Sequence, residues 1–241
     1  MWIAWFVVLG LWGIHSMVVD QDKPAQQEVV TATDVAYVDE QGVVRIRLRN
    51  GSQLAATAWK VTVGVVHIDG VERRRGRVVD GLAAFTGLEQ RDNRFIPAGG
   101  TIEAVFPIPR AKTVPLASRN ATVDWVIFED RSAVGDRAGI EEAFRLRESE
   151  RLAWTGVAAA MQAASAAQDS STGLQVARQT LGRPNQVDVR HPVIRTMQQN
   201  VERISASPEK YEEFVNYWSA RANRWVLELT RHGRAELQQP Q

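Results

Sequence analysis

Residues 44–49 read Val44-Arg45-Ile46-Arg47-Leu48-Arg49, and this stretch decides the fold class of the first half of the chain. Aliphatic side chains and arginines alternate strictly along it. Successive side chains of a β-strand point to opposite faces, so the alternation predicts a strand with one buried face and one face in water. The turn residues Asn50-Gly51-Ser52 follow directly and predict the end of the strand.

The same rhythm recurs on both sides of this strand. Alternating or β-branched segments predict four more strands, at 29–38, 59–65, 102–106 and 121–128. In the last of them we expect Val123, Trp125 and Ile127 to share one face. Because turn residues and no helical pattern separate these segments, residues 28–130 are predicted to form an antiparallel β-sandwich. The stretch 81–94 has no clear period and is expected to cross from one sheet to the other.

Several of these segments together resemble a known group of domains. They are the run 44–50 with Ser52, the strand 59–63, the turn Asp69-Gly70 and the turn Pro97-Ala98-Gly99 that follows Ile96. This order is similar to the small immunoglobulin-like domains of bacterial exported proteins, and the FxLYD-type domains are the nearest group. The aromatic-Leu-Tyr-Asp string that names that group is missing here. The resemblance implies an immunoglobulin-like fold and an extracytoplasmic setting, and it carries over no catalytic residue.

After residue 135 the pattern changes to helical spacing, and residues 136–236 are predicted to form a helical region. Asp136 is placed to cap the first helix, which we expect to reach about residue 168, with shorter helices at 174–181 and 193–204. Ser207-Pro208-Glu209 predicts a capping residue followed by proline at the first helical position of a last helix. The expected fold class is therefore α+β.

The last helix carries an apolar stripe whose members recur at alternating spacings of four and three: Tyr211, Val215, Trp218, Ala222, Trp225, Leu229 and His232. A period of 3.5 residues suits a helix that lies along another helix. We expect the stripe to pack on the helix that begins after Asp136. The alternative is an outward-facing stripe, in which case Tyr211, Trp218 and Trp225 are the partner-binding candidates. The partner would be an unknown envelope protein or a second copy of the chain.

The first 19 residues contain no charged side chain and are rich in Trp, Phe, Val, Leu and Ile. They predict an N-terminal apolar helix that serves as a signal peptide or a membrane anchor. No Lys or Arg precedes the apolar run and no Ala-x-Ala pattern follows it, so whether it is cleaved stays open. Residues 20–27 are predicted to be a linker. We expect an extracytoplasmic protein that is secreted or held at the membrane by residues 1–19.

The composition excludes several kinds of site. The chain has 29 basic and 28 acidic residues, which gives no reason to expect nucleic acid as a partner. It has no cysteine, which excludes disulfides, a thiol nucleophile and thiolate metal ligands. No catalytic motif and no cofactor fingerprint is present. The four histidines are not spaced as metal ligands.

Three charged groups invite a functional interpretation. His67, Asp69 and Glu72 are interpreted as a solvated turn that follows a strand, rather than as metal ligands. Glu129, Asp130 and Asp136 could contribute to a calcium site, but a connector with a capping Asp accounts for the same residues. The arginine run 73–77 is predicted to be a solvated hairpin loop, with contact to anionic lipid as the alternative. We therefore assign no catalytic, cofactor or metal residue.

Two classes of function remain. The first is a non-enzymatic envelope module that binds a partner. The second is an extracytoplasmic enzyme whose active site lies in a groove between the sandwich and the helices. A concave pocket that gathers at least two ionisable side chains with shifted pKa values would favour the enzyme.

Overall fold

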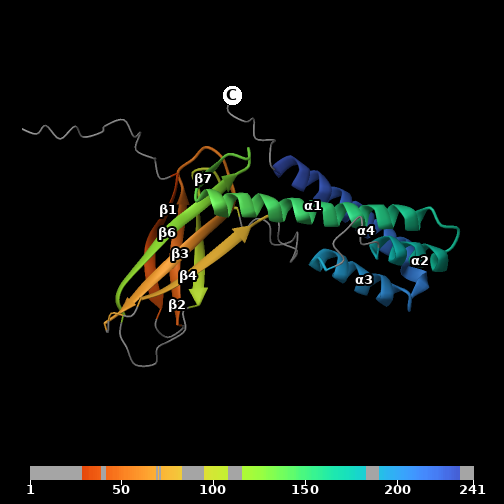
Figure 1. Ribbon diagram of the computed structural model, residues 1–241, viewed down its shortest axis with the longest axis horizontal. Coiled ribbons are helices and arrows are strands. Elements are labelled where there is room, and N and C mark those ends of the chain that lie inside the picture. Colours follow the sequence, from red (N-terminus) through yellow and green to blue (C-terminus); the bar gives the residue numbers. More distant parts are fainter. Residues whose placement is uncertain are drawn as a thin grey trace, which may run out of the picture.

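The computed structural model describes residues 29–38, 42–68, 70, 72–82, 95–107, 116–182 and 190–233 (Figure 1). The predicted apolar helix at 1–19 and the linker at 20–27 lie outside these residues. Among the helices that are described, none combines the length and apolarity needed to cross a bilayer. The described chain is a mixed α+β fold, as the sequence predicts.

Two antiparallel sheets pack face to face in the first half of the chain. The three-stranded sheet has the order β1 (Val30–Val38), β2 (Val43–Asn50), β5 (Thr101–Pro107). The four-stranded sheet has the order β4 (Glu72–Asp80), β3 (Ala56–His67), β6 (Leu116–Phe128), β7 (Ala133–Gly135). Apolar residues from both sheets share one core. The chain leaves the four-stranded sheet after β4 and enters the other at β5, so the stretch 81–94 does connect the two sheets.

The arginine-rich strand β2 has the two faces that its alternation predicts. Val44, Ile46 and Leu48 are buried in the shared core. The arginines between them point outward, where Arg45 pairs with Glu103 at 3.3 Å and Arg47 pairs with Asp34 at 2.7 Å. The buried face stabilises the sheet, since each fully buried aliphatic side chain contributes about 1.5–3 kcal/mol.

The turn after β2 contacts another of the sequence motifs that carried the resemblance. Asn50 is completely buried, and its side-chain amide donates hydrogen bonds to the carbonyls of Leu54, Ile96 and Pro97 at 2.8, 3.0 and 3.1 Å. The backbone N–H of Gly99 also donates to the Ser52 carbonyl at 3.1 Å. The Asn50-Gly51-Ser52 turn and the Pro97-Ala98-Gly99 turn are therefore in direct contact.

The arginine run 73–77, predicted as a solvated loop, forms the middle of strand β4 instead. Arg75 lies opposite Val63 in a regular antiparallel ladder with β3. β4 lies at the edge of its sheet, and the side chains of 72–78 are exposed. Because ladder hydrogen bonds use only the backbone, an edge strand needs no apolar side chains. The Arg77 guanidinium donates to the Val105 carbonyl of β5 at 3.1 Å, so it spans the two sheets at this edge.

Strand β6 also differs from its simple alternation. Val123 packs in the sandwich core, whereas Trp125 and Ile127 face the opposite side. The cause is a register shift against β3, where Lys60 lies opposite Trp125 but Val61 lies opposite Val123. The extra residue is a β-bulge, and it reverses the faces of the residues that follow. The expectation that Val123, Trp125 and Ile127 share one face is therefore wrong.

The helical half contains α1 (Arg137–Ser165), α2 (Ser170–Leu181), α3 (Pro192–Ile204) and α4 (Tyr211–His232). The carboxylate of Asp136 accepts the backbone N–H groups of Ala138 and Gly139 at 3.3 and 3.1 Å, as predicted for a cap. Asp169 caps α2 in the same way. The start of the last helix was predicted in part: Pro208 follows Ser207 at the first helical position, but that position opens a short 3-10 turn that leads into α4, and the Ser207 side chain makes no capping hydrogen bond.

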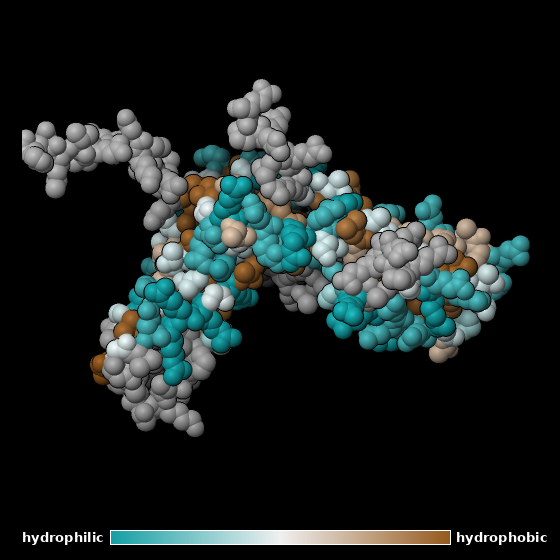
Figure 2. Space-filling model, viewed as in Figure 1, coloured by the Kyte–Doolittle hydropathy of each residue, from teal (hydrophilic) through white to brown (hydrophobic). Residues whose placement is uncertain are grey.

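The two halves form lobes that diverge from the start of α1, and α1 belongs to both (Figure 1). Its first turns place Ala143 and Phe144 against Trp125 and Ile127 on the outer face of the four-stranded sheet. Its later turns form a separate hydrophobic core with α2, α3 and α4. Hydrophilic residues dominate the face of the molecule seen in Figure 2. The described residues therefore form one hydrophobic core in each lobe and a third, smaller cluster where α1 meets the four-stranded sheet.

Candidate functional site

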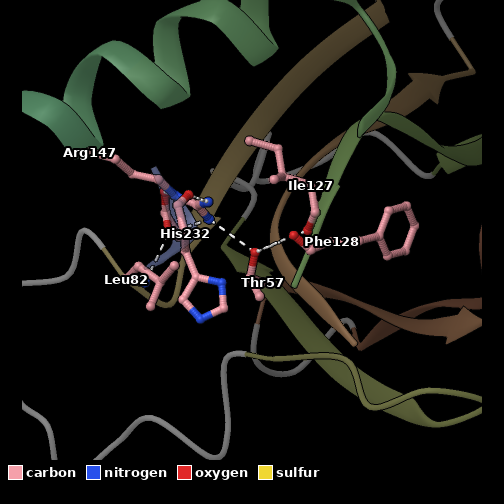
Figure 3. Close-up of polar contacts among 7 residues, drawn as sticks. Thr57, Leu82, Ile127, Phe128, Arg147 and His232 are labelled. Carbon is pink, nitrogen blue, oxygen red and sulfur yellow. Dashed lines mark hydrogen bonds and ion pairs between the residues drawn. The ribbon is translucent and has the colours of Figure 1, made fainter. Parts of the chain in front are cut away.

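A buried arginine connects the two lobes. Arg147 of α1 donates two hydrogen bonds, of 2.7 and 3.0 Å, to the carboxylate of Asp80 at the end of β4. Its other donors reach the hydroxyl of Thr57 on β3 and the carbonyl of His232 at the end of α4, both at 3.1 Å (Figure 3). The Arg147 side chain is 0% exposed and that of Asp80 only 10%. We call Thr57, Asp80, Arg147, Glu150 and His232 the junction cluster.

The neighbours of Arg147 continue this network into the sandwich. The Thr57 hydroxyl, which accepts from Arg147, donates to the Ile127 carbonyl at 3.2 Å (Figure 3). The Nδ1 of His232 lies 3.0 Å from the Glu129 carbonyl, to which it can only donate. Burial lowers the pKa of His232 below its ordinary value, so the ring is neutral at neutral pH. The end of α4 is therefore tied to the loop that follows β6.

Glu150 lies one turn beyond Arg147 and is 5% exposed. Burial, followed by the charge of Asp80, raises the pKa of Glu150 to about 8, against a weaker opposing hydrogen bond with Trp154. Its Oε1 has no hydrogen-bond partner within the described part of the chain. At neutral pH the carboxyl group is therefore mostly protonated, since the charged form would be buried without sufficient compensation.

Because the buried Glu150 carboxyl group holds this proton, we expect the free energy of unfolding to depend on pH. The unfolded chain releases it at the ordinary glutamate pKa, whereas the folded chain holds it until the pH rises through about 8. The folded state should therefore lose about 2 kcal/mol between pH 6.5 and pH 9, at 1.36 kcal/mol per pH unit and proton. Burial lowers the pKa of His232, which makes stability rise rather than fall with pH, so His232 cannot supply this slope. Urea unfolding across the range should show this slope in the wild type.

A matched pair of variants isolates Glu150 in that experiment. Glu150→Gln removes the titrating group and should give a stability that is nearly flat with pH. Glu148→Gln changes an exposed carboxyl group that pairs with Arg151 at 2.7 Å. This variant should keep the wild-type slope. Equal slopes in all three proteins would show that Glu150 does not hold the proton.

Sequence reasoning missed the junction cluster. Next to each other on α1, the apolar Leu146 is 46% exposed and the charged Arg147 is buried, which is the reverse of what side-chain polarity alone indicates. The available signal was the pair Arg147 and Glu150, three residues apart and in phase with Phe144, Trp154 and Val157. Charged residues on an apolar helical face are either exposed or paired inside. Asp80, the partner of Arg147, lies 67 residues away in the sequence, where no local pattern identifies it.

The apolar stripe of α4 packs on α1, so the packing that we expect from the sequence is confirmed. Trp225 is 2% exposed, and its ring stacks on Trp154 of α1 at a centroid distance of 6.0 Å. Trp218 is half-buried and stacks on the same ring at 6.5 Å. Of the three partner-binding candidates, Trp225 therefore lies in the helical core, where no partner can reach it. Partner contact by Tyr211 and Trp218 stays a prediction.

Tyr211 begins the stripe beside a pocket of about 510 Å³. Its hydroxyl donates to the Ala164 carbonyl at 2.6 Å. A Cβ on Gly173 would collide with that hydroxyl, so any larger residue there requires the Tyr211 side chain to move. Burial, then the nearby Asp169, raises the pKa of Tyr211, and hydrogen bonds from Thr172 lower the pKa of Asp169. This pocket gathers two shifted groups, but each has a structural role, as helix cap or as interhelical hydrogen bond.

At the edge of the stripe, the exposed Tyr217 and the half-buried Trp218 and Arg221 are in mutual contact. Arg221 donates to the Tyr217 hydroxyl at 2.6 Å, and its guanidinium lies 5.8 Å from the Tyr217 ring centre and 5.4 Å from that of Trp218. The two rings meet edge to face at 5.1 Å. We call Tyr217, Trp218 and Arg221 the aromatic unit. Cation–π and ring contacts hold it in one arrangement before any partner binds.

The predicted acidic group does not assemble into a metal site. The carboxylate of Glu129 accepts the Ala55 N–H at 3.1 Å, and Asp130 accepts from the Ser132 backbone and hydroxyl at 2.9 and 2.6 Å. Asp136 caps α1. Across the ranges that the structure describes, no three metal-ligating side chains cluster. Asp69 and the side chain of His67 lie outside those ranges.

No known protein family matches this sequence, and no curated protein does either. Among solved structures, the 1.85 Å X-ray structure of a hypothetical protein from Peptoclostridium difficile 630 is 12% identical, with a TM-score of 0.29, over 46% of this chain and 88% of its own. The Northeast Structural Genomics Consortium target SoR45 is 9% identical, with a TM-score of 0.21, over 44% and 74%. Likenesses this weak assign neither fold nor function.

Proposed function

We propose that the chain is a non-enzymatic, exported or membrane-tethered envelope protein that acts as an interaction module and binds its partner through α4. The uncharged apolar run at 1–19 supports export or tethering. The sandwich and the junction cluster then serve as a support that holds α4 in a fixed position. Such a module needs no catalytic constellation.

The observation that carries this proposal is the aromatic unit on α4. Trp, Tyr and Arg are the residues that most often dominate the binding energy of protein interfaces. Here all three lie together, and Arg221 fixes the Tyr217 ring through a hydrogen bond and a cation–π contact. A pre-organised set of this kind loses little conformational entropy on binding.

The immunoglobulin-like kinship of the sandwich is part of the same proposal. It is supported by the contact between the Asn50-Gly51-Ser52 turn and the Pro97-Ala98-Gly99 turn, which belong to the segments on which the likeness to FxLYD-type domains was based. Domains of this kind present loops and strand edges from a rigid core. Sandwiches host many functions, so this kinship favours a binding role without naming a ligand.

The alternative is an extracytoplasmic enzyme with its active site between the lobes. Glu150 favours it, because a carboxyl group with a raised pKa beside a second carboxylate is typical of an acid catalyst. The rest of the junction cluster opposes it. Arg147 is fully buried and already pairs with Asp80, so neither group is accessible to a substrate.

The experiment that tests the proposal is capture from native envelope with the full chain, including residues 1–19. We expect the wild type to retain a defined partner after cross-linking and washing. The Arg221→Glu protein should retain at least about tenfold less of that partner, as is usual when a hot-spot residue is lost. Arg145→Glu, a change of the same kind at an exposed position on α1, is the control and should retain the partner. Equal capture by all three proteins would remove α4 as the binding surface.

A further inference from the structure

A second stripe runs along α4 on the side away from α1. Its six members are all exposed and recur at spacings of four, three, four, three and four: Glu213, Tyr217, Ala220, Arg224, Leu227 and Arg231. It includes two large side chains that protein does not cover, since Tyr217 is 52% exposed and Leu227 is 68% exposed. We call these six residues the outer stripe.

The outer stripe has the period with which helices lie along one another. The apolar stripe that begins at Tyr211, which we now call the inner stripe, uses the same 3.5-residue period to pack on α1. α4 therefore has one seam filled by its own chain and a second, parallel seam that faces solvent. The exposed tyrosine and leucine of this seam are accessible to a second helix, which would bind along it as helices bind in grooves.

The order of residues along the outer stripe identifies that helix. If the stripe is laid against a copy of itself running in the opposite direction, Glu213 meets the partner's Arg231, Tyr217 meets the partner's Leu227, and Ala220 meets the partner's Arg224. Acid then faces base, and an aromatic ring faces an aliphatic chain. The small side chain of Ala220 leaves room for the long stem of an arginine, which covers apolar surface well.

From this complementarity we infer that the outer stripe is a homodimer interface, in which α4 packs antiparallel on α4 of a second copy. Every contact occurs twice, as a two-fold axis requires. A parallel arrangement would instead set Glu213 against glutamate and Arg231 against arginine, which is unfavourable. The inference rests on the proposed function, because it names the partner of the same helix as a second copy.

The dimer brings the aromatic unit to the rim of the interface. Tyr217 belongs to both the outer stripe and the aromatic unit, so Arg221 lies beside the two-helix contact. A single helix pair is at the small end of specific interfaces, roughly 1,200 Å² or less, and such contacts are weak in dilute solution. Tethering both copies to one membrane would raise their effective concentration and favour pairing.

Cysteine cross-linking tests the register directly, because the chain contains no cysteine of its own. Two differently tagged full-length copies, one with Ala220→Cys and one with Arg224→Cys, are oxidised together in membranes. We expect a mixed disulfide dimer as the main product. Copies with Leu152→Cys, a residue of α1 that is 47% exposed, should give at least about tenfold less, since they do not meet in the dimer. Equal cross-linking at both places, or cross-links mainly to another protein, would overturn the inference.

Charge reversal tests the pairing independently of the cysteines. Glu213→Lys and Arg231→Glu should each weaken co-capture of the two tagged copies by several-fold, and the double variant should restore it. Leu227→Glu should abolish co-capture while the melting temperature stays unchanged, because Leu227 is exposed in the monomer. Co-capture that survives Leu227→Glu would refute the homodimer. If it is refuted but capture from native envelope still depends on Arg221, the proposed function stands and only the identity of the partner is wrong.

Discussion

Replacing Arg147 with methionine is expected to lower the free energy of unfolding by about 3–5 kcal/mol, the usual cost of breaking a buried ion pair. The change leaves Asp80 buried without its cation and next to Glu150. It also removes the donors to Thr57 and to the His232 carbonyl. Because Arg147 connects two lobes with separate cores, we expect the single thermal transition of the wild type to divide into two. Calorimetry and urea unfolding check both results.

Two further variants separate the ion pair from simple loss of packing. Arg145→Met removes an arginine of the same helix that is exposed and pairs with Glu142, and it should change stability by less than about 1 kcal/mol. Adding Asp80→Asn to Arg147→Met should recover part of the loss, because the uncompensated charge is gone while an oxygen remains to accept the Leu82 N–H. A cost for Arg147→Met no greater than that of Arg145→Met would mean that the junction cluster does not hold the lobes together.

Replacing Trp225 with alanine should lower the free energy of unfolding by about 3–5 kcal/mol, the usual cost of truncating a buried tryptophan. Trp225 is almost completely buried and stacks on Trp154, so the cavity would open in the middle of the helical core. For a chain of this size the melting temperature should fall by about 10 °C. Because Arg147 is still present and connects the lobes, we expect this fall in a single transition.

Graded controls lie on the same helix. Trp218→Ala should lower the melting temperature by a smaller amount, since that ring is only half-buried. Tyr217→Ala should leave it nearly unchanged, because the side chain is mostly exposed. A reversed order, with Trp218→Ala or Tyr217→Ala more damaging than Trp225→Ala, would contradict the packing of α4 on α1.

The parts of the fold that depend on short-range pattern were predictable. Alternation between arginines and aliphatics marks β2, because the side chains of a strand point alternately to two environments. The capping positions of Asp136 and the inner stripe of α4 were likewise visible, since cap chemistry and the helical period both lie within a few residues. Each of these signals reports a local environment that the neighbouring residues also share.

The parts that depend on distant neighbours were not predictable. β4 has no apolar face, and only its place at the sheet edge explains a strand of arginines. The bulge in β6 arises from its register with β3, and it separates Val123 from Trp125. Arg147 is buried because Asp80, Thr57 and His232 meet it from three other elements. The outer stripe was visible in the sequence, but only the exposure of Tyr217 and Leu227 shows which seam of α4 is free.

The arginines of β4 also determine how crowded copies of this protein meet. A free strand edge is a template on which another chain can extend the sheet. Here that edge carries Arg73, Arg74, Arg75 and Arg77 within five consecutive positions. Two such edges brought together would oppose arginine with arginine, and like charges directly across a ladder are destabilising. This edge therefore resists pairing with the same edge of another copy, whereas an acidic strand would be attracted to it.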